Sequence, residues 1–373
     1  MLDVSIYSFP LPLLSLTSLR LRDFRCFPTL HCAMGGGITL FTGDNAQGKT
    51  SILEAVCVLL RLQSPRTTSG KELARFGTDG FGIAGTLNGQ DLTHAVSGAD
   101  KKLLIDGEPV RRTADYLAAS GLVVWMGNGD LELVSGTGEP RRRYLDFLGS
   151  QLFPEYRSAL KSYEKALRQR NFLLKRDVSP PWPEIDAYTA VLVSHGQVLL
   201  SLRAALLAKL TPHAAAAHAA IRAADPGSST PETLSLTWQP GGDIQNLHAQ
   251  LHDRRAEETR RRVTVCGPHR DDFSSTLDGL PAGTYASEGQ QRTLALSLKL
   301  AQATLLREAR QQSPILLLDD IFGELDPHRR NALLAALPGD SQKLITTTHL
   351  GWLDTQPLEA QRYLVERGAI RPG

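Results

Sequence analysis

The sequence has few cysteines, few aromatic residues and almost no excess charge of either sign. Its four cysteines include no C-x-x-C pair and no accompanying histidine cluster, which argues against a zinc site and against a disulfide framework. Lys and Arg number 41 against 39 Asp and Glu, a net charge of +2. The molecule as a whole therefore does not attract nucleic acid strongly, and any basic site must be local. We expect a globular cytoplasmic protein.

Long apolar runs are lacking as well. No stretch approaches the roughly 20 apolar residues of a membrane helix, so we expect no contact with a membrane. The opening segment, "MLDVSIYSFPLPLLSLTS", has no basic head and is interrupted by Pro10 and Pro12, which argues against a signal peptide. We expect residues 1–15 to form a flexible leader, and folded structure to begin near Leu16 with an edge strand in "LTSLRLRDFRCF".

The segment "FTGDNAQGKTSILEA" carries the phosphate-loop pattern G-x-x-x-x-G-K-[ST]. A β-branched run, "GITLF", precedes it and an apolar-faced helix, "TSILEAVCVLLRL", follows, as this pattern requires. The glycine-rich backbone and the helix N-terminus offer N–H groups to phosphate, Lys49 adds a charge, and Thr50 supplies a magnesium ligand. A Gly-rich turn without a ligand is the structural alternative. The residues expected to contact the nucleotide are Gly43, Asp44, Asn45, Ala46, Gln47, Gly48, Lys49, Thr50 and Ser51.

Two tight turns follow this helix. Asn88-Gly89 and Asp106-Gly107 each separate two strand-like segments, and these dipeptides supply the positive φ angles of two-residue hairpins. This part of the chain therefore predicts an antiparallel sheet beside the nucleotide-binding sheet.

The segment "PILLLDDIFGELD" near the C-terminus predicts a buried parallel strand that ends in two acids. The carboxyl ends of such strands border the ligand crevice. Asp319 is expected to bind Mg²⁺, and Asp320 to orient or deprotonate the attacking water. A buried strand that simply ends in a solvated turn is the alternative.

A third segment, "YASEGQQRTLALSLKLAQATLL", begins an amphipathic helix with polar residues. The free N–H groups and positive dipole end of such a helix can face an anion. Ser287 is also a good N-cap, so a merely capped helix is the alternative. The strand "KLITTTHL" adds His349 at the same crevice.

The phosphate loop, the polar start of a helix at Ser287, the strand that ends in two acids and the strand with His349 follow one another along the chain. Motifs in this order resemble the ABC-type ATPase head. Among such heads the chain is most similar to the RecF family of bacterial recombination mediators. The resemblance rests on "GDNAQGKTSILEA", "SPRTTSGKELARFG", "PRRRYLDF", "GPHRDDF", "YASEGQQRTLALSLKLA" and "LLLDDIFGELDPHRR". It implies an α/β fold with a mixed central sheet, an antiparallel sheet and an inserted, mainly helical lobe. The expected domains are an ATPase head at residues 16–130 and 259–373, and a helical lobe at 131–258.

The resemblance also implies an ATP-dependent homodimer that uses Mg²⁺. Ser287, Gly289 and Gln290 of one copy would reach the γ-phosphate held by the other, with Glu324 and Asp326 along the seam. Asp320, Lys49 and His349 are the expected catalytic residues. Related heads usually carry Glu where this chain has Asp320, which predicts slow hydrolysis suited to a switch. The glutamine-bearing coupling loop of ABC heads is left unassigned.

Two groups of cations are candidates for DNA contact. Spacings of 4, 4 and 3 residues place Arg157, Lys161, Lys165 and Arg168 on one helical stripe, although a solvated helix face gives the same pattern. Because the family acts on DNA, we expect these cations to contact the phosphates of the DNA backbone rather than the edges of the bases. The residues expected to bind DNA are Arg66, Lys71, Arg75, Arg141, Arg142, Arg157, Lys161, Lys165 and Arg168.

The resemblance therefore predicts an ATP-gated DNA-binding protein with weak ATPase activity, which closes on double-stranded or gapped DNA and helps to load the recombinase. RecR with RecO, and RecA, are the partners that it implies. A transporter's nucleotide-binding subunit is one alternative, although "ASEGQ" and the large helical insertion disfavour it, and a nuclease-associated ATPase is another. The role of "GPHRDDF" is left open among nucleotide sensing, DNA contact and a structural turn.

Overall fold

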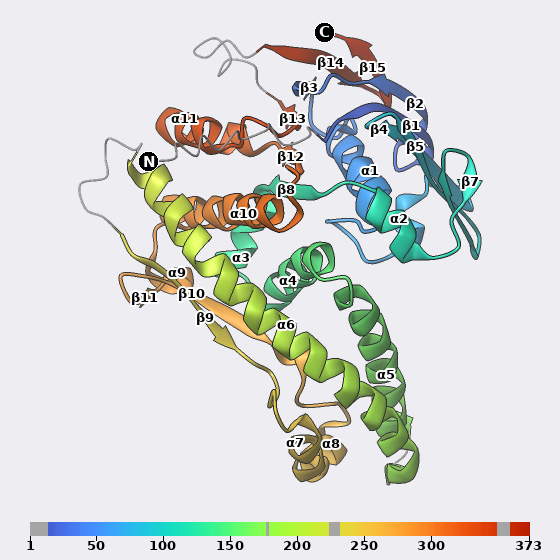
Figure 1. Ribbon diagram of the computed structural model, residues 1–373, viewed down its shortest axis with the longest axis vertical. Coiled ribbons are helices and arrows are strands. Elements are labelled where there is room, and N and C mark those ends of the chain that lie inside the picture. The colour runs from blue at the N-terminus through green and yellow to red at the C-terminus, as the bar shows by residue number, and fades with distance from the viewer. Residues whose placement is uncertain (1–13, 177–178, 224–231, 349–358) are drawn as a thin grey trace, which may run out of the picture. The chain divides into compact units, whose positions relative to one another are not determined.

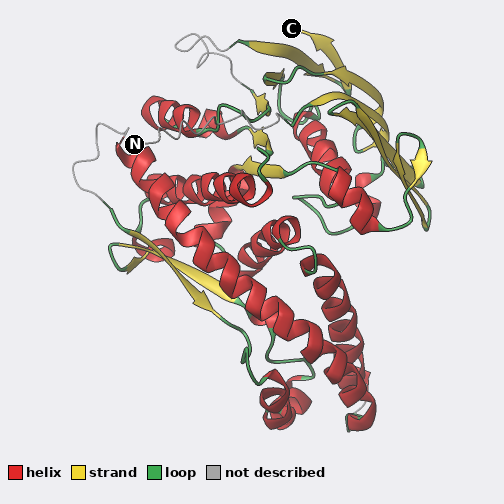
Figure 2. Ribbon diagram, viewed as in Figure 1, coloured by secondary structure: helices red, strands yellow, loops and turns green. Residues whose placement is uncertain are grey.

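The computed structural model describes residues 14–176, 179–223, 232–348 and 359–373. It divides the chain into two compact units, one formed by residues 1–128 and 306–373 and the other by residues 129–305. Strands are concentrated in the first unit, whereas the second is mostly helical (Figures 1 and 2). Residues 259–305 fall in the second unit, so their predicted assignment to the ATPase domain stays a prediction. The expected leader lies almost wholly outside the described residues, and so does His349.

The first unit contains two six-stranded sheets. One is antiparallel, with strand order β2-β1-β4-β5-β6-β7. The other has order β15-β14-β3-β13-β12-β8 and is parallel except for β15. The elements are β1 (Leu16–Phe24), β2 (Phe27–Ala33), β3 (Ile38–Thr42), α1 (Lys49–Arg61), the 3₁₀ helix η1 (Gly70–Leu73), β4 (Gly80–Leu87), β5 (Gln90–Ser97), β6 (Asp100–Ile105), β7 (Glu108–Pro109), α2 (Thr113–Ala119), β8 (Val123–Gly127), β12 (Ile315–Asp319), η4 (Ile321–Glu324), α11 (Pro327–Ala336), β13 (Lys343–Thr347), β14 (Ala360–Glu366) and β15 (Ala369–Pro372).

The two predicted hairpins are confirmed, because Leu87 pairs with Gln90 across Asn88-Gly89 and Ile105 pairs with Glu108 across Asp106-Gly107. The expected edge strand is wrong in one respect. The strand β1 pairs with both β2 and β4, so β2 forms the edge of the sheet. Alternating apolar residues indicate that one face of a strand is buried. They do not indicate whether the strand pairs with one neighbouring strand or with two.

The phosphate-loop helix α1 packs between the two sheets, where it contacts strands of both (Figure 1). All but one of its residues are buried, Lys49 and Glu54 among them. A helix buried on all sides can hold charged residues only if each is paired. The partners of these two residues define the site described below.

The second unit is built on helices around a three-stranded sheet of order β11-β10-β9. Its elements are η2 (Asn128–Leu131), whose first residue belongs to the first unit, α3 (Glu132–Ser135), α4 (Gly138–Leu152), α5 (Tyr156–Arg176), α6 (Trp182–Ala223), β9 (Leu234–Gln239), α7 (Leu247–Asp253), α8 (Arg255–Arg261), η3 (Pro268–Arg270), β10 (Asp272–Leu277), β11 (Leu280–Pro281), α9 (Ala282–Tyr285) and α10 (Glu288–Arg310), which ends in the first unit.

The helix α6 is a single helix of 42 residues that continues through Pro212. By length and composition alone it could span a membrane, although no unbroken apolar run in the sequence approaches this length. The length of this apolar helix is not evident from the sequence, because polar residues interrupt every apolar run. Leu192 and Leu199 of α6 are fully buried in a cluster with Tyr156 and Tyr163 of α5, so we interpret α6 as the core helix of the second unit.

The "GPHRDDF" segment lies at the centre of this unit. Asp271 accepts a hydrogen bond of 2.7 Å from the Arg203 guanidinium of α6 and another of 2.7 Å from the Gly241 N–H. His269 contacts the Tyr163 hydroxyl at 2.6 Å and the Thr264 carbonyl at 3.0 Å. These contacts join the segment to helices α5 and α6 and to the backbone beside β9, which favours the structural reading among the three left open.

Candidate nucleotide site and basic loop

The phosphate loop connects β3 to α1, as the sequence predicts. Gly43 and Gly48 have φ angles of 142° and 107°, which side chains rarely allow. A Cβ atom at Gly48 would lie 2.6 Å from the Cys26 sulphur and 2.8 Å from the Phe27 ring. The second glycine is therefore required both by the backbone angle and by the close approach of the β1–β2 hairpin.

Lys49 is buried and folds back onto its own loop. Its Nζ donates hydrogen bonds of 2.7 Å to the carbonyl oxygens of Gly43 and Asp44. Burial lowers the pKa of Lys49, and the carboxylates of Asp320, Asp319 and Asp44 oppose that shift. The ammonium group is thus held by exchangeable carbonyl contacts inside the loop, where a phosphate oxygen can replace them.

Thr50 and Asp319 are brought together as expected of a magnesium site. Thr50 Oγ1 donates to Asp319 Oδ1 at 2.8 Å, and Thr346 Oγ1 donates to the same oxygen at 2.8 Å. Burial raises the pKa of Asp319, while these two hydroxyl groups lower it. The Thr50 hydroxyl in the first turn of α1 and the Asp319 carboxylate at the end of β12 are oxygen ligands of the kind that Mg²⁺ accepts. These two residues therefore fit the ion.

Asp320 adopts a left-handed conformation with φ of 53° directly after β12. The Thr346 hydroxyl accepts a hydrogen bond of 2.9 Å from its N–H. Within the described part of the chain, the buried Oδ1 atom of Asp320 accepts no hydrogen bond. A buried acceptor without a partner is costly, and a water molecule placed for attack on a phosphate would satisfy it.

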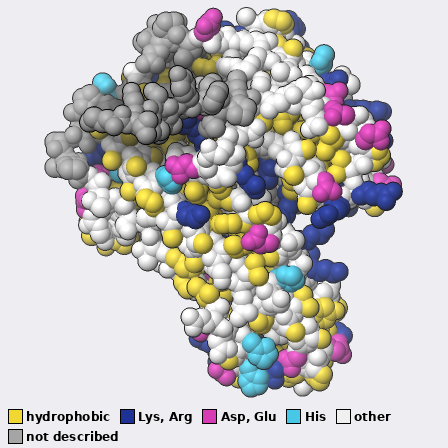
Figure 3. All heavy atoms as spheres, in the orientation of Figure 1, with side chains coloured by type: hydrophobic (Ala, Val, Ile, Leu, Met, Phe, Trp, Pro, Cys, Tyr) yellow, Lys and Arg dark blue, Asp and Glu magenta, His cyan; other side chains and the backbone are white. Residues whose placement is uncertain are grey.

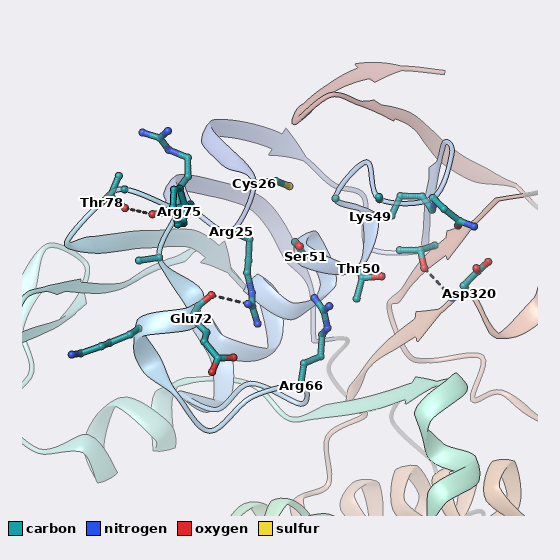
Figure 4. A pocket seen from close by; sticks show the side chains of 18 residues that line it. Arg25, Cys26, Lys49, Thr50, Ser51, Arg66, Glu72, Arg75, Thr78 and Asp320 are labelled. Carbon is teal, nitrogen blue, oxygen red and sulfur yellow. Dashed lines mark hydrogen bonds between the residues drawn. The ribbon is translucent and has the colours of Figure 1, made fainter.

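Lys49, Thr50, Asp320 and Thr346 line one cavity of about 1020 Å³ (Figure 4). Its wall continues from the phosphate loop to the β1–β2 turn and to the segment that precedes β4. The lining residues are Arg25, Cys26, Asn45, Ala46, Gly48, Lys49, Thr50, Ser51, Arg66, Lys71, Glu72, Ala74, Arg75, Phe76, Gly77, Thr78, Asp320 and Thr346. We call residues 63–79 the basic loop. Gln47, which is not among the lining residues, accepts a hydrogen bond of 2.7 Å from the Arg367 N–H.

Glu54 connects α1 to the basic loop. Its fully buried carboxylate accepts hydrogen bonds of 2.8 and 2.6 Å from Arg25 and one of 2.6 Å from the Ser64 hydroxyl. Arg66 reaches the same carboxylate at 3.3 Å, and its guanidinium points toward the start of α1 in Figure 4. The sequence predicts that Arg66 binds DNA, which stays a prediction, and the structure shows that Arg66 lines this cavity.

The other two cations of the basic loop differ from each other. Arg75 donates to Asp23 Oδ1 at 2.8 Å, and its N–H donates to the Asp23 carbonyl at 2.8 Å. This residue anchors the loop to β1. Lys71 lies in η1 and is exposed. Arg66 is also exposed, but Arg66 and Arg75 contact the carboxylates of Glu54 and Asp23.

In the second unit, Ser287 and Gln290 form a capping box at the start of α10. Ser287 Oγ accepts from the Gln290 N–H at 3.3 Å, and Gln290 Oε1 accepts from the Ser287 N–H at 2.8 Å. The Gln290 amide also donates to Glu232 at 2.7 Å. Glu232 in turn contacts Arg222 at 3.1 Å and His218 at 3.2 Å. The predicted capped helix is present, with an exposed Ser287.

The acids predicted to line a dimer seam lie in the turn after β12. Glu324 is exposed in η4, and Asp326 caps α11 by accepting a hydrogen bond of 3.0 Å from the Arg329 N–H. Asp326 therefore has a local structural role whether or not it also faces a second copy.

The predicted DNA-binding cations of the second unit fall into two sets. Arg141 forms a bidentate pair with Asp272 at 2.6 and 2.8 Å, and Arg142 donates to the Asp271 carbonyl at 2.9 Å. Both hold the "GPHRDDF" segment. On α5, the exposed residues are Lys161, Lys165 and Arg168, whereas Arg157 is half-buried. Cationic and acidic side chains are interspersed over the face shown in Figure 3.

Sequence reasoning did not single out Arg25, Cys26 and Thr346, which line the cavity, or Glu54, which lies behind its wall. Glu54 could have been noticed in the sequence, because it is a charged residue in a helix whose other residues are mostly apolar. Arg25 and Cys26 could not, since their place depends on the β1–β2 turn meeting the phosphate loop.

Comparison with known proteins shows what the chain is similar to. A family model described as an AAA domain matches residues 18–110. A DNA replication and repair protein RecF from Synechococcus sp. (strain JA-3-3Ab) is 38% identical over 95% of this chain and 97% of its own.

Two solved structures are similar in fold. One, described as the recombination mediator protein RecF with ATP in the RecFOR pathway, has 25% identity and a TM-score of 0.85 over 98% of this chain and 99% of its own. The other is an Smc head domain from Pyrococcus furiosus, with 14% identity and a TM-score of 0.52 over 96% and 95% of the two chains. The fold class predicted from the sequence is confirmed, and the full-length similarity at 38% identity shows that the chain belongs to the RecF family of DNA replication and repair proteins.

Proposed function

We propose that the chain binds ATP with Mg²⁺ in the cavity of the phosphate loop and uses it to close two copies of itself on DNA. The supporting observation is the convergence of Lys49, Thr50, Asp319 and Asp320 on one site. A cation, a hydroxyl ligand and two carboxylates are the groups that phosphoryl transfer uses. Thr50 and Asp319 would hold Mg²⁺, which would neutralise negative charge on the phosphates.

The nucleotide would be shared between two copies. Ser287, Gly289 and Gln290 of the second copy would contact the γ-phosphate, with Glu324 and Asp326 along the seam. His349 would contact the γ-phosphate from the same copy as Lys49. The exposed start of α10 supports this role, because its N–H groups and positive dipole end suit an anion. Gln290 must release Glu232 to take part. In this proposal residues 16–130 and 259–373 act as the ATPase head and 131–258 as the inserted lobe.

Hydrolysis would be slow and stimulated by DNA, so that ATP acts as a timed switch. Asp320 would orient the attacking water and accept its proton through the oxygen that has no other partner. Its side chain is one methylene shorter than the glutamate of related heads, which favours a low turnover. A turnover in the hundreds per second, at the upper end of ordinary enzymes, would contradict the switch.

The DNA would be double-stranded with a gap or a junction, and it would be bound through its backbone. Lys71 and the exposed cations of α5, Lys161, Lys165 and Arg168, are the residues best placed for phosphate contact. The proposed partners are RecR with RecO, and RecA, in loading the recombinase in the cytoplasm. Family membership supports these partners.

The test is a gel-shift of gapped duplex DNA with and without MgATP. Lys49→Ala should lose ATP binding and ATP-dependent DNA binding together, while Lys102→Ala, at an exposed position of β6, serves as the matched control. Indifference of the unmodified chain to DNA under both conditions would contradict the proposal and favour the transporter-subunit alternative.

A further inference from the structure

Phe76 is the most exposed large hydrophobic residue of the described chain, with an exposed fraction of 101%. It stands in the basic loop between Arg75 and Gly77, on the wall of the cavity that also contains Arg66 and Lys71. A fully exposed phenylalanine gains nothing from folding, because its ring remains in water. Its position therefore calls for a ligand rather than for packing.

The backbone that carries this ring is held in a closed turn. The Thr78 N–H donates to the Arg75 carbonyl at 3.0 Å, and the Thr78 hydroxyl donates to the same carbonyl at 2.8 Å. Gly77 has a φ of 83°, at the third position of the four-residue turn, where a type II turn requires a positive φ. Phe76 is thus the corner residue of a closed turn.

The base of the turn is fastened to the β1–β2 hairpin. Backbone hydrogen bonds of 2.8 Å join the Arg75 N–H to the Asp23 carbonyl and the Arg25 N–H to the Leu73 carbonyl. The Arg75 guanidinium adds its 2.8 Å contact with Asp23. A ring on an anchored turn loses little conformational freedom on binding, so a contact made through it retains most of its energy.

The cations near Phe76, Arg66 and Lys71, indicate the class of ligand. Cations beside an exposed aromatic ring are the combination that proteins use for unpaired nucleic acid, since bases stack on the ring while the cations contact the backbone. In paired DNA the faces of the bases are covered by their neighbours, so only an unpaired base or a strand end offers a face to Phe76.

We propose that Phe76 is a stacking platform for an unpaired nucleobase, and that the basic loop uses it to distinguish the single-stranded part of a gap or junction from continuous duplex. This inference rests on the proposed DNA binding and deepens it, because it names the residue that confers preference for DNA structure. Lys71 contacts the adjacent phosphate, and Arg75 holds the turn in place.

The experiment measures fluorescence anisotropy of the full chain with MgATP and three labelled probes: blunt duplex, single strand, and duplex with a single-stranded gap. Phe76→Ala should weaken binding of the single-stranded and gapped probes by about 5- to 150-fold, the range for loss of one stacked base. Binding of blunt duplex should stay unchanged. Phe76→Trp should retain the preference and Phe76→Leu should lose it, since a leucine is apolar but cannot stack.

Leu280→Ala is the matched control, because Leu280 is another exposed large hydrophobic residue, 57% exposed, on β11 and away from the cations proposed to contact DNA. The affinity for ATP should be the same in all variants. An equal loss on all three probes, no loss on any, or a reduced affinity for ATP, which would assign the ring to adenine, would each overturn the inference. If the unmodified chain bound none of the probes, the proposed function would fail and this inference with it.

Discussion

Thr50 Oγ1 donates a hydrogen bond of 2.8 Å to Asp319 Oδ1, and this contact joins the first turn of α1 to the end of β12. The same hydroxyl is the proposed magnesium ligand. Thr50→Val should therefore weaken MgATP binding by about tenfold or more, while ATP binding in EDTA stays unchanged. Thr39→Val is the control, because Thr39 is a buried threonine of β3 whose hydroxyl has no hydrogen-bond partner among the described residues. Isothermal titration calorimetry measures both, and equal losses with and without magnesium would exclude the ligand role.

Asp320 has a role separable from binding. Its Oδ1 is buried without a partner, so an amide can replace the carboxylate without breaking a contact of that oxygen. Asp320→Asn should reduce the ATPase rate by about 10²- to 10⁴-fold, as expected when a general base is lost, with unchanged affinity for MgATP. Single-turnover hydrolysis and equilibrium binding distinguish the two effects. A variant that hydrolyses ATP normally would assign the base to another residue.

Glu54 should matter for stability and for the basic loop. Its fully buried carboxylate pairs with Arg25 and Arg66, and removing one charge of a buried network leaves the other charges without compensation. Glu54→Gln should lower the free energy of unfolding by about 3 kcal/mol, measured by denaturant titration. Glu72→Gln, at an exposed position of the same loop, should change it little. Equal effects of the two changes would refute a special role for Glu54.

His269 predicts a dependence of stability on pH. Its Nε2 donates to the Thr264 carbonyl, which leaves the Nδ1 of a neutral ring to accept from the Tyr163 hydroxyl. Burial, with smaller contributions from Arg270 and Arg142, lowers the pKa of His269 to about 4 from 6.5. The unfolded chain binds the proton below pH 6.5 and the folded chain only below about 4. The contribution of the neutral His269 ring to the free energy of unfolding is therefore complete above pH 6.5. It is lost as the pH falls from 6.5 to about 4.

The size of this loss is about 3 kcal/mol, from 1.36 kcal/mol for each pH unit. His269→Gln keeps a donor and an acceptor but cannot take up a proton. The difference in unfolding free energy between the unmodified chain and this variant should shrink between pH 7 and pH 4. A constant difference over that range would show that His269 does not titrate with folding.

Features that depend on neighbouring residues could be predicted from the sequence. The two hairpins, the phosphate-loop glycines and α5 each carry their signal within a few residues, as does the pair of acids after β12. Contacts between distant residues could not be predicted. Glu54 meets Arg25 across 29 positions and Gln290 meets Glu232 across 58, and nothing in either local pattern names the partner. For the same reason the sequence did not show that Arg141, which is predicted to bind DNA, pairs with Asp272.

The central claim is that ATP joins two copies of the chain through the start of α10. Ser287 is exposed there, so an arginine should be tolerated by the fold while its bulk and charge obstruct a second copy. Ser287→Thr keeps the hydroxyl cap and is the control.

Size-exclusion chromatography with light scattering, in saturating MgATP with the Asp320→Asn change to prevent turnover, tests this most directly. The account predicts a doubling of mass for the chain and for Ser287→Thr, and a single copy for Ser287→Arg that still binds ATP. A chain that stays a single copy in MgATP, with or without DNA, or a Ser287→Arg variant that dimerises normally, would contradict it.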